Sequence, residues 1–175
     1  MQQDGVTENV IDMDLFLRIA RHRMMDHYLI KLLRAIRELN QEELWRHPTE
    51  QLNSTGGIVL HIAEQVQRSA NRYRTAMYVP HGQGIEEYFP DTGISPGELA
   101  SMVERVFSEW HGAVSQVAVQ ARHAEDMHHL FHLIEHTGYH LGQIIDRVQW
   151  MTSMSFQFCQ NGLNERNLRL LIENS

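Results

Sequence analysis

The stretch from residue 126 to residue 152, DMHHLFHLIEHTGYHLGQIIDRVQWMT, constrains the fold most, because it is long, free of proline and apolar at helical spacing. At about 100° per residue, its apolar side chains form one stripe along a helix. This stripe consists of Met127, Leu130, Phe131, Ile134, Leu141, Ile144, Ile145 and Val148. Five of the chain's twelve histidines lie in the same stretch, mostly outside the stripe: His128, His129, His132, His136 and His140. We therefore predict a long core helix that carries a row of imidazoles.

The distribution of proline extends this prediction to the whole chain. All four prolines lie between residues 48 and 96, so the strongest helix breaker is missing from both flanks, and neither flank alternates with period two. We predict an all-α fold with helices over residues 10–39, 55–78, 96–121 and 126–152, in one domain, 1–175. The helical core covers about 10–152. Residues 153–175 form a tail that docks on a neighbouring surface, with one short helix after Gly162.

Local signals predict how these helices begin. Ser95, Pro96 and Glu98 match a capping box with proline in the first helical position. Asn53 or Ser54 is expected to cap the second helix, and Asn9 the first. The first helix is expected to bury Leu15, Met25, Leu29 and other apolar residues at helical spacing. Two glycines in the first turn of the second helix, residues 56 and 57, are expected to let another segment approach closely.

The segment between the second and third helices is long for a loop in a compact domain. Residues 79–95, VPHGQGIEEYFPDTGIS, contain two prolines and three glycines. Loops of this length are often functional or connect distant ends of helices. At about 3.3 Å per residue this segment can span the length of a helix, so the second and third helices need not be antiparallel neighbours.

Composition excludes several classes of partner. The net charge is −7 and no basic run occurs, which argues against nucleic acid or an anionic membrane as the main partner. No apolar run approaches the roughly 18 residues of a membrane-spanning helix, and the polar N-terminus does not match a secretory signal. The single cysteine, Cys159, cannot form an intrachain disulfide. We therefore expect a protein of the reducing cytoplasm.

The spacing of the histidines suggests a metal site. Two histidines at positions i and i+4 lie one turn apart and can chelate one ion. About one such pair is expected by chance at this composition, yet three occur in succession from His128 to His140. A solvated polar face is the alternative explanation. Because each four-residue step drifts by about 40°, only one adjacent pair can face a given ion. His140 lies nearest the apolar stripe, which favours the pair His136 and His140.

A third ligand is needed, because two histidines alone bind weakly, and His61 on the second helix is the best candidate. Glu64, Gln65 and Gln143 are candidates for positioning the ligands or a bound water. Three neutral imidazoles with open positions are typical of a catalytic metal. Imidazole suits zinc, nickel, copper and iron alike. Such an ion would acidify a bound water or bind a substrate thiol as its thiolate.

Three segments together resemble the DinB-like (DinB/YfiT) superfamily: L-W-R-H-P at 44–48, N-S-T-G-G-I-V-L-H-I-A-E at 53–64, and H-T-G-Y-H-L-G-Q-I at 136–144. The likeness covers roughly residues 10–152. It implies a four-helix bundle with a long crossover between helices 2 and 3, and a divalent ion on the positions of His61, His136 and His140. The sequence departs from the family's commonest pattern, H-E-x-x-H-x-G-Q, at Thr137.

The resemblance also implies a function, for which three hypotheses remain. The first is a metal-dependent transferase that uses a low-molecular-weight thiol, with zinc or nickel, or alternatively iron or manganese, as its ion. The second is a non-catalytic dimeric bundle with a structural or vestigial metal. The third is a metal-free bundle with a histidine-rich surface. A homodimer is expected, and we expect its contacts to include residues 154–175. The expected substrate is a small molecule.

Overall fold

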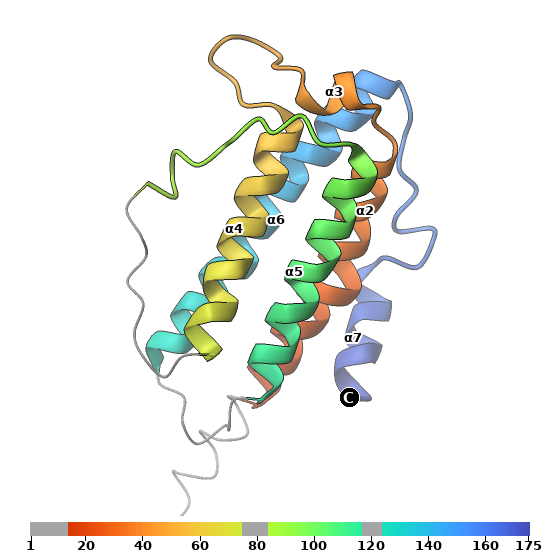
Figure 1. Ribbon diagram of the computed structural model, residues 1–175. Coiled ribbons are helices and arrows are strands. Elements are labelled where there is room, and N and C mark those ends of the chain that lie inside the picture. Colours follow the sequence, from red (N-terminus) through yellow and green to blue (C-terminus); the bar gives the residue numbers. More distant parts are fainter. Residues whose placement is uncertain (1–13, 75–83, 117–123) are drawn as a thin grey trace, which may run out of the picture.

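A computed structural model describes residues 14–74, 84–116 and 124–175, and every regular element within these ranges is helical, so the predicted all-α class is confirmed (Figure 1). Residues 14–22 are helical and continue into a π-helical segment. The elements are η1 (Arg23–Leu29), α2 (Ile30–Arg37), α3 (Gln41–Trp45), α4 (Thr55–Arg74), α5 (Pro96–Gln116), α6 (Ala124–Thr152) and α7 (Glu165–Glu173). None of these helices is both long enough and apolar enough to cross a membrane.

The long helices pack side by side. α4 contacts α5 and α6 along its length, and η1 with α2 contacts the same two helices. Figure 1 shows that α4 and α5 both begin at the end of the molecule where α3 lies, whereas α2 and α6 end there. The chain therefore leaves α4 at the end of the molecule far from α3 and returns to the α3 end, where α5 begins. Its described part, residues 84–95, lies against the start of α4 and is called the 84–95 segment below.

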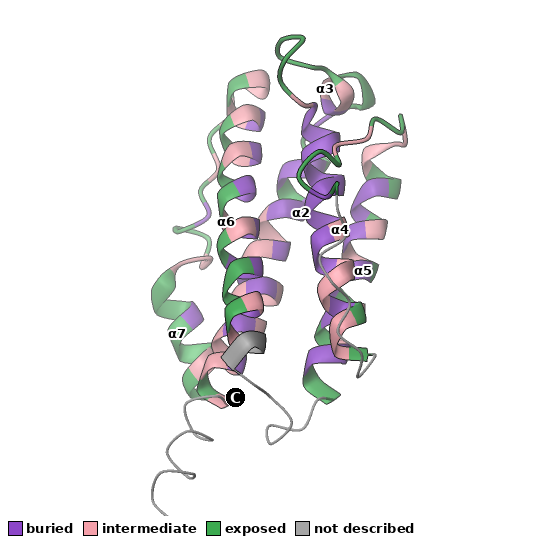
Figure 2. Cartoon of the chain, turned by 90° about the vertical axis from the view of Figure 1, so that its left-hand side faces the viewer, coloured by how far each residue is buried: buried purple, intermediate pink, exposed green. Residues whose placement is uncertain are grey.

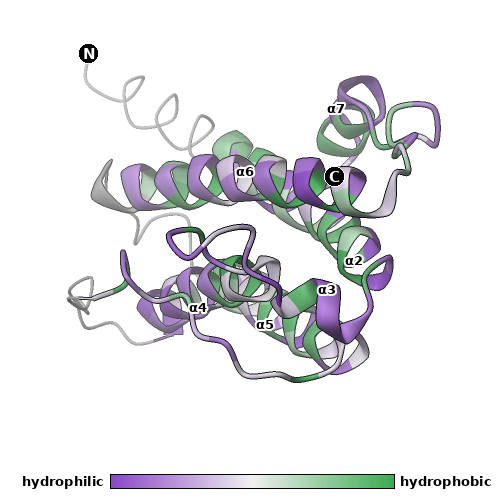
Figure 3. Cartoon of the chain, turned by 90° about the horizontal axis from the view of Figure 1, so that it is seen from above, coloured by the Kyte–Doolittle hydropathy of each residue, from purple (hydrophilic) through white to green (hydrophobic). Residues whose placement is uncertain are grey.

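Apolar side chains fill the space between these helices. Figure 2 shows the buried residues of α6 on the side that faces the other helices, and Figure 3 shows that hydrophobic and hydrophilic residues alternate along the helices. Phe107 and Trp110 of α5 are fully buried, and burial of such a ring contributes roughly 2–3 kcal/mol. The indole N–H of Trp110 donates to Ser69 Oγ at 3.1 Å. The one polar atom of this large ring thus keeps a hydrogen bond in the core.

The π-helical segment corrects the predicted core face of the first helix. A regular helix would bury Leu15 and Met25 together with Leu29, but Leu15 is 40% exposed and Met24 is completely buried in place of Met25. A π-turn inserts one residue into the helical repeat. The buried face therefore passes from Leu29 to Met24, one residue away from the predicted Met25, and then to Leu17, two residues away from the predicted Leu15. A prediction from periodicity assumes the same number of residues in every helical turn, so it cannot detect this shift.

The predicted helix starts are confirmed where the structure describes them. Ser54 Oγ accepts the Gly57 backbone N–H at 2.9 Å and so caps α4. At α5, the backbone N–H of Ser95 donates to Glu98 at 2.9 Å, and Ser95 Oγ accepts the Glu98 N–H at 3.3 Å, which completes the capping box. The expected cap at Asn9 and the expected ends of the second and third helices lie outside the described residues.

The close approach expected at Gly56 is made by Trp45. A Cβ atom at residue 56 would lie 2.5 Å from a ring carbon of this tryptophan. The indole N–H of Trp45 donates to the Ile94 carbonyl at 2.8 Å. Trp45 therefore joins α3, the first turn of α4 and the 84–95 segment. Pro48, which follows α3, is exposed.

The long histidine-bearing helix is present as α6, with two deviations from its predicted faces. Phe131 was expected in the core but is 55% exposed. The other deviation is that Leu133 and Thr137 are buried beside the stripe, whereas the predicted residues Leu130, Ile134, Leu141, Ile144 and Val148 are buried as expected. Tyr28 packs against Gly138, where a Cβ atom would lie 2.9 Å from the tyrosine hydroxyl oxygen. The space around Gly142 is open.

The tail docks on its own chain through α7. Phe158 and Leu168 are buried, and α7 contacts η1. Arg23 forms a bidentate ion pair with Glu165, with N–O distances of 2.9 and 3.0 Å. The tail therefore forms one short helix after Gly162, and this helix contacts the first part of the chain.

Candidate metal centre

Two helices bring the three predicted ligands together. α4 carries His61, and α6 carries His136 and His140 one turn apart. The ring centroids lie 4.9 Å apart for His61 with either partner and 4.5 Å apart for His136 with His140. One nitrogen from each ring falls in a group whose members all lie within 4.8 Å of one another. The convergence expected from helical spacing is thus present in the structure.

His61 is more deeply buried than its expected place at the edge of a stripe. It is 1% exposed, and the first turns of α4 are buried on every side from Thr55 to Ala63. Trp45 covers this end of α4 on one side, and the 84–95 segment covers it on another. Phe89 stacks on the His61 ring, with centroids 4.3 Å apart and an interplanar angle of 13°. The ring is therefore held in one orientation.

Outer hydrogen bonds select the nitrogens that face inward. His61 Nδ1 lies 3.2 Å from the Tyr88 carbonyl, and His140 Nδ1 lies 2.8 Å from Gln143 Oε1. Because both partners are acceptors, each Nδ1 carries the proton and each Nε2 keeps a lone pair. His61 Nε2 lies 3.1 Å from His136 Nε2. Ligands about 2.0–2.1 Å from a tetrahedral zinc ion lie at nearly this separation from one another.

The surroundings keep the three rings neutral. Burial is the main cause that lowers the pKa of each histidine. Burial, followed by the neighbouring His140, His61 and His132, lowers the pKa of His136 to about 4. The nearby charge of His140 also lowers the pKa of His61. Neutral imidazoles offer the lone pairs that a metal needs, so the donor set fits a divalent cation. His136 Nδ1 is buried without a hydrogen-bond partner.

The predicted helper residues are only partly in place. Gln143 orients His140 through the hydrogen bond described above. Glu64 instead forms an ion pair with Arg68, at 2.6 Å. Gln65 is buried one turn beyond His61, but no hydrogen bond joins it to the three histidines in the described part of the chain. Gln143 is therefore the one predicted helper that contacts a ligand.

The other histidines of α6 do not enter the cluster. His132 is exposed, and its ring centroid lies 5.6 Å from that of His136. His128 and His129 lie nearer the start of α6, and their ring centroids are 5.9 Å apart. This arrangement agrees with the expected drift, which permits one adjacent pair to face an ion.

The 84–95 segment contributes partners that sequence reasoning missed. Tyr88 and Phe89 hold His61, and Asp91 fastens the segment to the start of α4. Asp91 lies 2.6 Å from His47 Nε2, and its second oxygen accepts the Ser54 hydroxyl at 2.6 Å. The hydrogen bond to Asp91 is the main cause that raises the pKa of His47. The length of this segment was the one available signal, since a backbone carbonyl has no signature in sequence.

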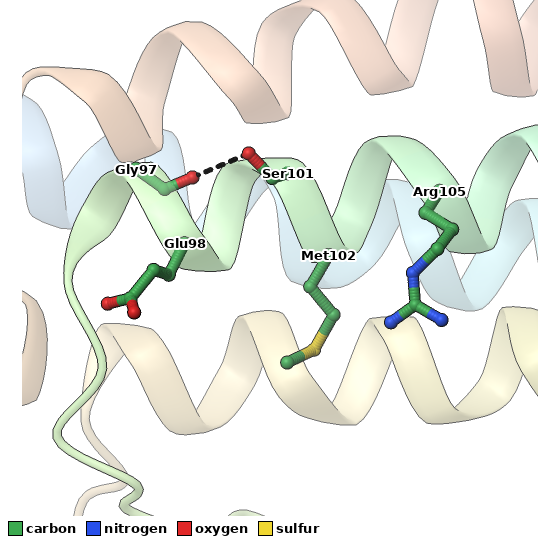
Figure 4. Close-up of a pocket in the computed structure, with 5 residues that line it drawn as sticks. All are labelled: Gly97, Glu98, Ser101, Met102 and Arg105. Carbon is green, nitrogen blue, oxygen red and sulfur yellow. Dashed lines mark hydrogen bonds between the residues drawn. The ribbon is translucent and has the colours of Figure 1, made fainter.

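A shallow depression elsewhere on the surface lacks the features of a reactive site. It lies along α5 and is lined by Gly97, Glu98, Ser101, Met102 and Arg105 (Figure 4). The Ser101 hydroxyl already donates to the Gly97 carbonyl at 2.9 Å. The lining side chains are exposed or half-buried, and none belongs to the histidine cluster. The cluster is therefore the stronger candidate.

No protein-family model, curated protein or solved structure matches this chain. The chemistry of the histidine cluster is therefore argued from its geometry.

Proposed function

We propose that this chain is a divalent-metal-dependent enzyme that transfers a low-molecular-weight thiol to small electrophilic molecules, a detoxification type of activity. One observation supports the proposal most: three neutral imidazoles from two helices direct nitrogens at a common point. Three protein nitrogens leave room in the coordination sphere for a substrate, as is typical of catalytic rather than closed structural sites.

A divalent ion held by these nitrogens supplies Lewis acidity, which favours the thiolate form of a bound thiol or the hydroxide form of a bound water. The chain's own residues hold and orient this centre. Tyr88 and Gln143 fix the orientation of two ligands, while Phe89 excludes water from one face of His61. A fixed, partly dehydrated cluster holds its ligands in place before the substrate arrives.

We further propose that the chain is a DinB-like four-helix bundle with a crossover between its second and third long helices. The common starting end of α4 and α5 supports this, because the connection must then return along the molecule. The distribution of the three ligands, one on α4 and two on α6, also agrees with the resemblance. We assign the activity to a reducing cytoplasm, since the one cysteine, Cys159, is free.

A thiol panel tests the proposed activity. We expect the zinc- or nickel-loaded protein to accelerate conjugation of a chromogenic electrophile with bacillithiol, mycothiol, glutathione or cysteine, and to do so for at least one of them. Removal of the metal by a chelator, or the substitution His140→Ala, is expected to abolish the acceleration. If the loaded protein leaves every thiol at its uncatalysed rate, the transferase hypothesis is wrong and the non-catalytic dimeric bundle with a structural metal is the better explanation.

We also propose that the chain forms a homodimer to which the tail contributes. α7 buries Leu168 against its own chain but leaves Leu170 and Leu171 nearly half exposed. These two leucines are available to a second copy. Deletion of residues 154–175 is expected to shift the protein toward monomer in sedimentation velocity. The double substitution of Leu170 and Leu171 by serine should have the same effect without removing α7. An unchanged sedimentation coefficient in both variants would contradict this role.

A further inference from the structure

Residues 88–91, called the strap below, lie along one face of α4 and run in the direction opposite to the helix. The residues of α4 on this face stand at positions i, i+3 and i+7, and they are Ser54, Gly57 and His61. Asp91 contacts the first of them, and the Phe89 carbonyl lies against the second. The Tyr88 carbonyl and the Phe89 ring contact the third. The strap therefore joins the start of α4 to the first metal ligand.

The strap is held close to the helix backbone at Gly57 and at the cap of α4. A Cβ atom at residue 57 would lie 3.2 Å from the Phe89 carbonyl oxygen, so a larger residue would push the strap outward. The buried Ser54 hydroxyl accepts the Gly57 N–H at 2.9 Å and donates to Asp91 Oδ1 at 2.6 Å. One hydroxyl group thus caps α4 and fastens the strap to it.

His47 holds the other oxygen of Asp91, and it does so as a cation. Its Nε2 lies 2.6 Å from Asp91 Oδ2, and its Nδ1 lies 2.8 Å from the Leu52 carbonyl oxygen. Because the carboxylate and the carbonyl are both acceptors, both ring nitrogens carry protons. An exposed ion pair alone contributes little. Here the same carboxylate also accepts from the buried Ser54 hydroxyl, so both of its oxygens are held.

We propose that Asp91 is a positioning residue of the metal centre, which fixes the tautomer and the orientation of His61 through the strap. This inference rests on the proposed metal centre. The Tyr88 carbonyl accepts the proton of His61 Nδ1, which leaves the lone pair of Nε2 for an ion, and the stacked Phe89 ring keeps the imidazole from turning. Asp91 follows Phe89 by two residues, so loss of its carboxylate releases this part of the strap from α4.

Three variants test this role at about pH 7.5, where a free imidazole is neutral. Asp91→Ala removes both hydrogen bonds of the carboxylate. Asp91→Asn restores both, because its oxygen accepts from Ser54 and its amide N–H donates to a neutral His47. Asp26→Ala is the matched control. Asp26 pairs with His22 at 2.7 Å, away from the strap, and its side chain is 44% exposed, compared with 43% for Asp91.

The first measurement uses metal-free protein, so it does not depend on the proposed ion. Long-range proton–nitrogen NMR spectra show which ring nitrogen of a histidine carries the proton, and the His61 signal is assigned by its absence in His61→Asn. We expect a single Nδ1–H tautomer of His61 in wild type, Asp91→Asn and Asp26→Ala, and a mixture of both tautomers in Asp91→Ala. A single Nδ1–H tautomer in Asp91→Ala, or a mixture already in wild type, would overturn the proposal.

The second measurement is the affinity for Zn²⁺, determined by competition with a chromophoric chelator. We expect Asp91→Ala to bind about 10-fold more weakly than wild type, and Asp91→Asn and Asp26→Ala to stay within about twofold. An equal loss in Asp26→Ala, or an Asp91→Asn variant as impaired as Asp91→Ala, would contradict the role assigned to the two hydrogen bonds of Asp91. If wild type binds no Zn²⁺, the proposed metal centre fails, while the tautomer spectra still decide whether Asp91 positions His61.

Discussion

Substitution of His136 by alanine is expected to abolish stoichiometric metal binding, the largest effect predicted for this chain. Wild type should carry about one divalent ion per chain after purification in chelator-free buffer, and His136→Ala should retain less than a tenth of this. His136 is one corner of a nearly equilateral triangle of ring centroids, and its Nε2 lies 3.1 Å from that of His61. Its loss leaves two nitrogens, and sites of this kind bind weakly. Metal content is measured by elemental analysis, and circular dichroism checks that the helices are intact.

His132→Ala is the matched control for this experiment. It removes the same side chain one turn earlier on the same helix, from an exposed position whose ring centroid is 5.6 Å from that of His136. We expect this variant to keep its ion. If His136→Ala retained stoichiometric metal, or if His132→Ala lost it equally, the three-histidine centre would be wrong and a broader histidine-rich surface would be the better explanation.

The choice of His136 and His140 among the four spaced histidines was possible from sequence, because it depends on helix geometry alone. A drift of about 40° for every four residues separates the ring directions, and the apolar stripe shows which pair faces inward. The start of α5 was equally accessible, since the contacts among Ser95, Pro96 and Glu98 are local. Features of this kind depend only on residues that are close together in the sequence.

Features that depend on tertiary contacts were not accessible in this way. The π-turn between residues 23 and 29 moved Met24 into the core, and no pattern in the sequence distinguishes this from a regular helix. The burial of His61 depends on the 84–95 segment, and Trp45 covers the first turn of the same helix at Gly56; both come from other parts of the chain. The periodicity of α4 alone placed His61 at an edge.

The lowered pKa of His136 predicts how the free energy of unfolding of the metal-free protein changes at acid pH. The pKa is about 4 in the folded chain and about 6.5 in the unfolded chain. Between these values the unfolded chain binds more protons, so the free energy of unfolding decreases as pH falls from about 6.5 to 4. Burial lowers the pKa of His61 and His140 in the same direction. Above pH 6.5 these rings are neutral in both the folded and the unfolded state, so their titration no longer reduces the free energy of unfolding.

We expect metal-free wild type to lose about 1–2 kcal/mol of unfolding free energy between pH 7 and pH 5, after allowance for solvent screening at the half-buried His136 ring. Urea unfolding in the presence of a chelator measures this loss. His136→Asn should make the loss of stability less steep, because asparagine does not titrate while His61 and His140 still do, whereas His132→Asn should follow wild type. The lowered pKa values of Asp91 and Glu165 act below this window, since both carboxylates remain ionised at pH 5. Equal slopes in wild type and His136→Asn would contradict the assignment of the acid sensitivity to this ring.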